Sequence, residues 1–166
     1  MVINKWTVTV AIVLVAGFAY YFFVYDSPKK QIRKQFAVLA GKLEKQAGES
    51  PLITAGKAKT AANVFAHICT VDIPEYDIQK KITTKEMAQH ILAFKSRLAA
   101  MSVRFYDLSV ELTGENRAVA AVTLEIRATY TREETEEDTK EFECLLEKTE
   151  DGWKFYHIKA VEVLEK

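Results

Sequence analysis

The residue types that carry most protein chemistry are scattered along this 166-residue chain. Its three histidines, His67, His90 and His157, lack the His-x-x-x-His spacing that brings two imidazoles to one zinc ion. Its two cysteines, Cys69 and Cys144, each lie in an apolar stretch, which favours small buried side chains and leaves open whether they are free. The sequence contains no glycine-rich phosphate loop and no Gly-x-Ser-x-Gly motif. We therefore expect no metal site and no cofactor.

The overall composition excludes several classes of protein. Lys and Arg together number 23, as do Asp and Glu, so the formal net charge is zero. A neutral chain is not a polybasic nucleic-acid binder, and we expect no nucleic-acid partner. Hydrophobic residues make up 49% of the chain, which is too many for a disordered protein.

The segment from Trp6 to Tyr25 contains no charged residue. A helix of this length, rising ~1.5 Å per residue, spans roughly 30 Å, the thickness of the hydrocarbon core of a bilayer. Aromatic residues stand at both ends of the segment, as they do at the two membrane interfaces. The sequence predicts an uncleaved single-pass anchor over residues 1–26, in contact with membrane lipid, followed by one domain over residues 27–166. Cleavage before Tyr20 is the alternative.

A cluster of cations follows the predicted anchor directly. We call it the basic patch, and it consists of Lys29, Lys30, Arg33 and Lys34. The positive-inside rule would keep the domain in the cytoplasm, whereas short amino-terminal anchors often export a large following domain. We expect a single-pass protein of a bacterial inner membrane and leave the side of the domain open.

The periodicity of the apolar residues predicts helices first and strands afterwards. Apolar stripes indicate helices at about 30–47 and 52–66, followed by an extended stretch at 67–76. A Thr83-x-x-Glu86 capping box begins a third helix, whose expected stripe is Met87, Ile91, Phe94, Leu98 and Met101. The period then changes to two, and strands are expected at about 103–113, 117–131, 137–149 and 153–164. This order predicts an α+β fold with three helices on a curved, mostly antiparallel sheet of four or more strands.

Charge is unevenly distributed along the domain. Residues 27–60 carry eight cations and two glutamates, a net charge of +6, whereas residues 131–150 carry three cations and nine acids, a net charge of −6. The basic region next to the predicted anchor could touch anionic headgroups.

The order of elements and three segments carry a resemblance to a known superfamily. The segments are CTVDIPEYD with Asp72, the helix start TTKEMAQHILAF, and the Asp-Gly-Trp-Lys-x-x-x-Ile hairpin at 151–158. Over about residues 30–165 the chain resembles the nuclear transport factor two-like superfamily, which includes SnoaL-like and ketosteroid-isomerase-like cones. The resemblance implies an α+β cone, here as a membrane-anchored member.

The resemblance also implies which polar groups would line the cone. Isomerases of the superfamily use an acidic base, and Asp72 is its positional counterpart. The donor expected on the first helix is missing, because the inward stripe of that helix is apolar. Alternation along the first predicted strand puts Arg104 and Tyr106 on the face of Leu108 and Val110. The expected pocket-lining residues are Asp72, Arg104, Tyr106, Tyr130 and Tyr156, each with an ordinary surface role as the alternative.

Two functions fit these features. The favoured one is a membrane-tethered, non-catalytic binding or assembly module, with a protein partner or a second copy on the outer face of the sheet. The alternative is a small pocket enzyme that performs isomerase- or dehydratase-like acid–base chemistry on an apolar molecule through Asp72, Tyr106 and Tyr130. A roomy cone with an acid inside favours the enzyme, and a cone filled by Phe36, Leu39, Phe94 and Ile126 favours the module.

Overall fold

The computed structural model describes residues 13–15, 27–131 and 134–161. The predicted anchor over residues 1–26 lies almost wholly outside these residues. Within the described part of the chain, no helix has both the length and the apolar character needed to cross a membrane.

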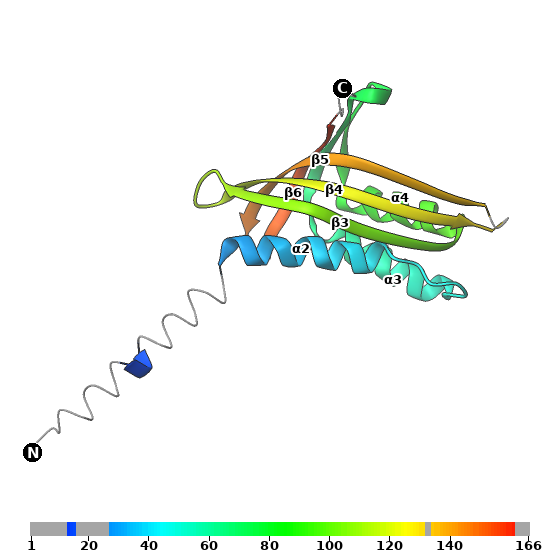
Figure 1. The fold of residues 1–166 in the computed structure, drawn as a ribbon, viewed down its shortest axis with the longest axis horizontal. Helices are drawn as coiled ribbons and strands as arrows, with labels where there is room; N and C mark the ends of the chain where they lie inside the picture. The colour runs from blue at the N-terminus through cyan, green and yellow to red at the C-terminus, as the bar shows by residue number, and fades with distance from the viewer. Residues whose placement is uncertain (1–12, 16–26, 132–133, 162–166) are drawn as a thin grey trace, which may run out of the picture.

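The domain is built on a single curved sheet of six strands (Figure 1). The strands are β1 (Phe65–Ile73), β2 (Ile78–Thr83), β3 (Leu98–Leu112), β4 (Arg117–Tyr130), β5 (Thr135–Thr149) and β6 (Gly152–Val161). Their order across the sheet is β2-β1-β6-β5-β4-β3, and every neighbouring pair is antiparallel except β1 and β6. The α+β class and the four predicted strands are confirmed, and β1 and β2, joined by the short 3-10 helix η1 (Pro74–Tyr76), extend the sheet.

Three helices accompany the sheet, and each begins at a side-chain cap. Helix α2 (Pro28–Leu43) is capped by Ser27, and α3 (Pro51–Ala62) is capped by Ser50. Helix α4 (Thr84–Ser96) begins at the predicted capping box, in which the side chains of Thr83 and Glu86 each bond the backbone of the other residue. Figure 1 shows α2 and α3 following one another beside the sheet, with α4 behind the long strands.

The ends of all three helices differ from the prediction. Helix α2 ends at Leu43 rather than near residue 47, and α3 ends at Ala62 rather than at residue 66. The predicted stripe of α4 is wrong beyond Ile91, because Phe94 is 43% exposed and Leu98 and Met101 already belong to β3. These two residues are buried, as expected, but they pack from a strand with Val103 and other apolar side chains.

Aromatic rings fill one end of the cone. The ring of Phe36 on α2 meets that of Phe105 edge-on at 5.3 Å and that of Phe155 at 4.9 Å. Phe155 is also 5.7 Å from Phe65, so rings from α2, β1, β3 and β6 meet in one cluster. This cluster belongs to the main core, which also contains the fully buried Ile32, Cys69, Leu146 and Trp153.

Two lysines cap the carboxyl-terminal ends of α2 and α4 reciprocally. The Lys95 ammonium on α4 donates to the carbonyl oxygens of Lys42 (2.8 Å) and Glu44 (3.0 Å) at the end of α2. In return, the Lys45 ammonium donates to the carbonyl of Lys95 in the last turn of α4 (2.9 Å) and to that of Leu98 just beyond the helix (2.6 Å). Two backbone bonds between Lys45 and Met101 then join this corner to β3. The last carbonyls of a helix have no partner within it, and here cations supply the partner and also complement the helix dipole.

We predict that Lys95→Met lowers the free energy of unfolding by roughly 2 kcal/mol, because the carbonyl of Lys42 loses its Lys95 donor and the carbonyl of Glu44 keeps only its contact with Lys57. The measurement is urea denaturation followed by circular dichroism. Lys34→Met on the exposed face of α2 is the matched control and should change the free energy by less than about 0.5 kcal/mol. Equal midpoints for the two variants would show that the cap contributes nothing.

Candidate functional site

The burial of side chains on the apolar face of the sheet decreases along the long strands. Around Phe36 and Leu39 the side chains are fully buried, whereas Leu124, Phe142 and Ile158 on the same face are only half-buried. Of the four residues expected to fill the cone, Phe36 and Leu39 lie in the core, and Ile126 packs on the second cluster around Met101. Phe94 is 43% exposed and does not help to fill the cone. One end of the cone is therefore filled, and the other is lined by apolar groups.

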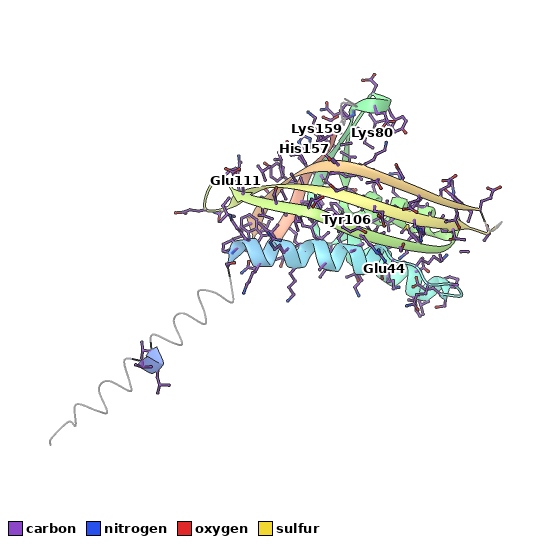
Figure 2. The ribbon with its side chains drawn as sticks, in the orientation of Figure 1. Glu44, Lys80, Tyr106, Glu111, His157 and Lys159 are labelled. Carbon is purple, nitrogen blue, oxygen red and sulfur yellow. The ribbon has the colours of Figure 1, made fainter. Side chains whose placement is uncertain are left out.

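Asp72 lies on the opposite face of the sheet from these groups. It is half-buried on β1, in register with Lys159 of β6, which is exposed. The next register pair, Val71 and Ile158, points to the apolar face, because Ile158 packs on the main core. Figure 2 shows Lys159 near His157 at this end of the sheet. The only counterpart of the isomerase base therefore faces away from the apolar interior.

A β-bulge places Arg104 and Tyr106 on the outer face as well. The pairing of β3 with β4 shifts between Tyr106 and Ser109, and Asp107 within the shift has a φ of +50°. Phe105 consequently points into the core on one side of the bulge, and Leu108 does so on the other. The predicted shared face of Arg104 and Tyr106 with Leu108 is wrong, because strict alternation does not survive the bulge. The Tyr106 hydroxyl instead lies 3.3 Å from both carboxylate oxygens of Glu125 on β4.

The other two tyrosines occupy different places. Tyr130, at the end of β4, packs against the second apolar cluster, and its hydroxyl donates to Glu136 at 3.0 Å. This hydrogen bond raises the pKa of the Tyr130 hydroxyl. Tyr156 is half-buried at the irregular step of β6, where Phe155 pairs with Leu146 and His157 already pairs with Leu145. The structure does not bring the five pocket candidates together.

The histidines and cysteines form no joint site. Among the described residues, no group of three or more His, Cys, Asp or Glu side chains is placed to hold a metal ion. Cys69 and Cys144 are free and buried, and burial raises the pKa of each thiol to about 12. They stand on β1 and β5, and the intervening β6 keeps neighbouring backbones about 4.8 Å apart on each side, too far for a disulfide.

A buried polar cluster at the reciprocal lysine caps was not predicted from the sequence. Lys95 is fully buried, and burial lowers the pKa of its ammonium to about 8, an effect that Glu49 opposes and Lys57 and Lys45 reinforce. Although burial alone would raise the pKa of Glu49, hydrogen bonds from Lys57 and Thr54 lower it. The available signal was the spacing of Lys95, four residues after Ile91 on the apolar stripe of α4. This cluster satisfies the carbonyls at two helix ends and its side chains are buried or half-buried, which indicates a structural role.

Two hollows bounded by described residues lie outside the filled core. One, of about 490 Å³, is a groove between α3 and α4 to which no strand residue contributes. The other, of about 390 Å³, is bounded by Pro74, Glu143, Lys159, Ala160 and Val161. The four cations of the basic patch are exposed at the start of α2.

Comparison with solved structures shows which known folds this domain resembles. No known family profile matches the chain, and no curated protein matches it in sequence. A candidate scytalone dehydratase from Novosphingobium aromaticivorans superposes with a TM-score of 0.67 at 12% identity, over 82% of this chain and 84% of that one. A candidate dehydratase of the NTF2-like family from Streptomyces avermitilis gives 0.60 at 15% identity, over 82% and 97%.

A nuclear transport factor two-like protein from Salmonella enterica gives a TM-score of 0.61 at 13% identity, over 84% of this chain and 93% of that one. The chain has the nuclear transport factor two-like fold. The resemblance predicted from the sequence is confirmed at the level of the superfamily fold. At these identities the likeness concerns the fold alone, so the argument for function rests on the side chains of this nuclear transport factor two-like domain.

We predict that stability depends on alkaline pH through Lys95. Above pH 8 the folded chain holds this amine neutral, whereas the unfolded chain keeps it protonated up to about pH 10.5. The unfolded state then binds more protons, so the free energy of unfolding rises with pH across this interval. Relative to Lys95→Met, the wild-type chain should gain on the order of 1 kcal/mol per pH unit in urea titrations. A constant difference from pH 8 to 10.5 would show that the Lys95 pKa is not depressed.

Proposed function

We propose that this chain is a non-catalytic binding or assembly module held at a membrane by residues 6–25. The observation that carries the proposal is the position of Asp72 on the outer face of the sheet. The acid–base chemistry that the resemblance implies needs the Asp72 carboxylate within hydrogen-bond reach of the substrate, and the apolar interior is on the other face of the sheet. Tyr106, a further candidate for that chemistry, is also on the outer face.

The tether is supported by the sequence and by the exposed charges beside it. The uncharged segment from Trp6 to Tyr25 is long enough to span a bilayer. The basic patch is exposed on the first turns of α2, directly after this segment. Each cation near an anionic leaflet contributes about 1 kcal/mol, so the patch would hold the domain against headgroups.

The outer face of the sheet is the proposed surface for a protein partner or a second copy. Its exposed side chains are polar and charged, as in the ion pair of Arg127 with Glu137 at 2.6 Å. A surface of this kind binds through complementary charge, and such binding weakens with salt.

Two observations support the enzyme alternative. Half-buried apolar groups line one end of the cone, and two of the similar structures are named as candidate dehydratases. Tyr130 is the candidate that remains beside this lining.

The tether predicts the behaviour of the chain in cell fractions. The intact chain should stay in the membrane fraction after an alkaline carbonate wash, because a spanning apolar helix is not removed by breaking ionic contacts. Deletion of residues 6–25 should release the domain into the supernatant. Replacing the basic patch by glutamates is the control and should leave the wash result unchanged. Release of the intact chain would overturn the tether.

The binding role predicts salt-sensitive capture through the outer face. Chemical crosslinking of the intact chain in its membrane should give a discrete adduct that is lost at high salt and weakened by Glu141→Lys with Glu143→Lys on β5. The matched control, Glu115→Lys with Glu150→Lys in exposed turns, should retain it. An intact chain that turns over an apolar substrate, and loses this activity on Asp72→Asn, would establish the enzyme instead.

A further inference from the structure

The groove between α3 and α4 has the size of a small-molecule site. Its volume is about 490 Å³, within the range of roughly 300–1,000 Å³ that is typical of ligand pockets. Alanines form the floor: α3 contributes Ala55, Ala58 and Ala62, which share one helical face, and α4 contributes Ala88. With no larger side chain on this floor, the space between the two helices stays open.

The groove has one polar and one apolar end, because α3 and α4 run antiparallel. The Thr84 hydroxyl at the start of α4 donates to the carbonyl of Ala66, just beyond the end of α3. At the other end, Lys57 of α3 and Lys95 of α4 both donate to the carbonyl of Glu44. The polar end therefore contains Asn63, Thr84 and Lys85, and the apolar end contains Ala55 and Leu92, continued by the 84% exposed Leu52 on the same face of α3.

Two cations border the groove without a counterion. The side chains of Lys59 and Lys85 both line it, and neither makes an ion pair or hydrogen bond with another residue in the described part of the chain. An apolar floor with unpaired cations at one end is complementary to a molecule with an alkyl chain and an anionic head.

We propose that this groove binds a single-chain alkyl carboxylate, such as a medium-chain fatty acid. The carboxylate lies between Lys59 and Lys85, and the alkyl chain runs over the alanine floor towards Leu92. The proposal rests on the binding role inferred above and does not depend on the tether.

The test is site-resolved photocrosslinking of the intact chain in phospholipid nanodiscs. The probes are two dodecanoate analogues, one with a diazirine at the methyl end and one with a diazirine next to the carboxylate. Peptide mass spectrometry should place adducts of the first probe at Leu52, Ala55 and Leu92, and adducts of the second at Ala62 and Lys85. This reversal of position along the groove is expected only if the carboxylate lies at the lysine end.

Matched variants separate groove binding from partition into the bilayer. Lys59→Glu with Lys85→Glu should lower the adduct yield roughly tenfold, the effect of losing a charge-assisted contact. Ala88→Phe should abolish the adducts by filling the floor. Lys80→Glu with Lys81→Glu, a double charge reversal on exposed residues of β2, should leave the yield unchanged. Circular dichroism confirms that each variant is folded.

Several outcomes would overturn the proposal. These are equal labelling by a neutral dodecanol analogue, stronger labelling of the same residues by a diazirine phospholipid, and adducts spread evenly over the domain. Loss of membrane association would remove the tether but not the groove, since the same labelling can then be run in solution. Turnover that depends on Asp72 would remove the binding role while leaving the position of the adducts as a separate result.

Discussion

The two lysines that exchange carbonyl partners at the ends of α2 and α4 are the contact on which the arrangement of the helices depends. Burying an ammonium costs free energy, and the hydrogen bonds from Lys95 to the carbonyls of Lys42 and Glu44 offset this cost. The same corner holds β3 through Lys45 and reaches α3 through Glu49 and Lys57. It thereby fixes three helices and the first long strand relative to one another.

This arrangement separates an apolar and a polar side of one sheet. Rings from α2, β3 and β6 close one end of the apolar side, so this end cannot admit a ligand. The polar side carries Asp72, Arg104 and Tyr106, which stand on the opposite face of the sheet from the apolar interior. The fold shared with dehydratase-like structures does not by itself specify a chemistry, since the fold supplies the scaffold and the side chains decide its use.

The parts of the structure that follow from local pattern were predictable from the sequence. The capping box of α4 and the alternation along β4 and β5 depend on neighbouring residues, and both are confirmed. The bulge at Asp107 inverts the predicted faces of Arg104 and Tyr106, and its position depends on pairing with β4. The spacing of Lys95 placed it on the apolar stripe of α4, but its role could not be predicted, because its partners are carbonyls of another helix. Tertiary features of this kind, the bulge in β3 and the register of β1 with β6, decide which faces Asp72, Arg104 and Tyr106 occupy.

The separation of charge along the molecule has a mechanical consequence. The basic patch lies at the start of α2, and the acidic first residues of β5 lie at the opposite end of the long strands (Figure 1). A neutral body with opposite charges at its ends has a permanent electric dipole moment, and an electric field exerts a torque on it. Above an anionic surface this torque turns the basic end towards the surface and the acidic start of β5 away from it.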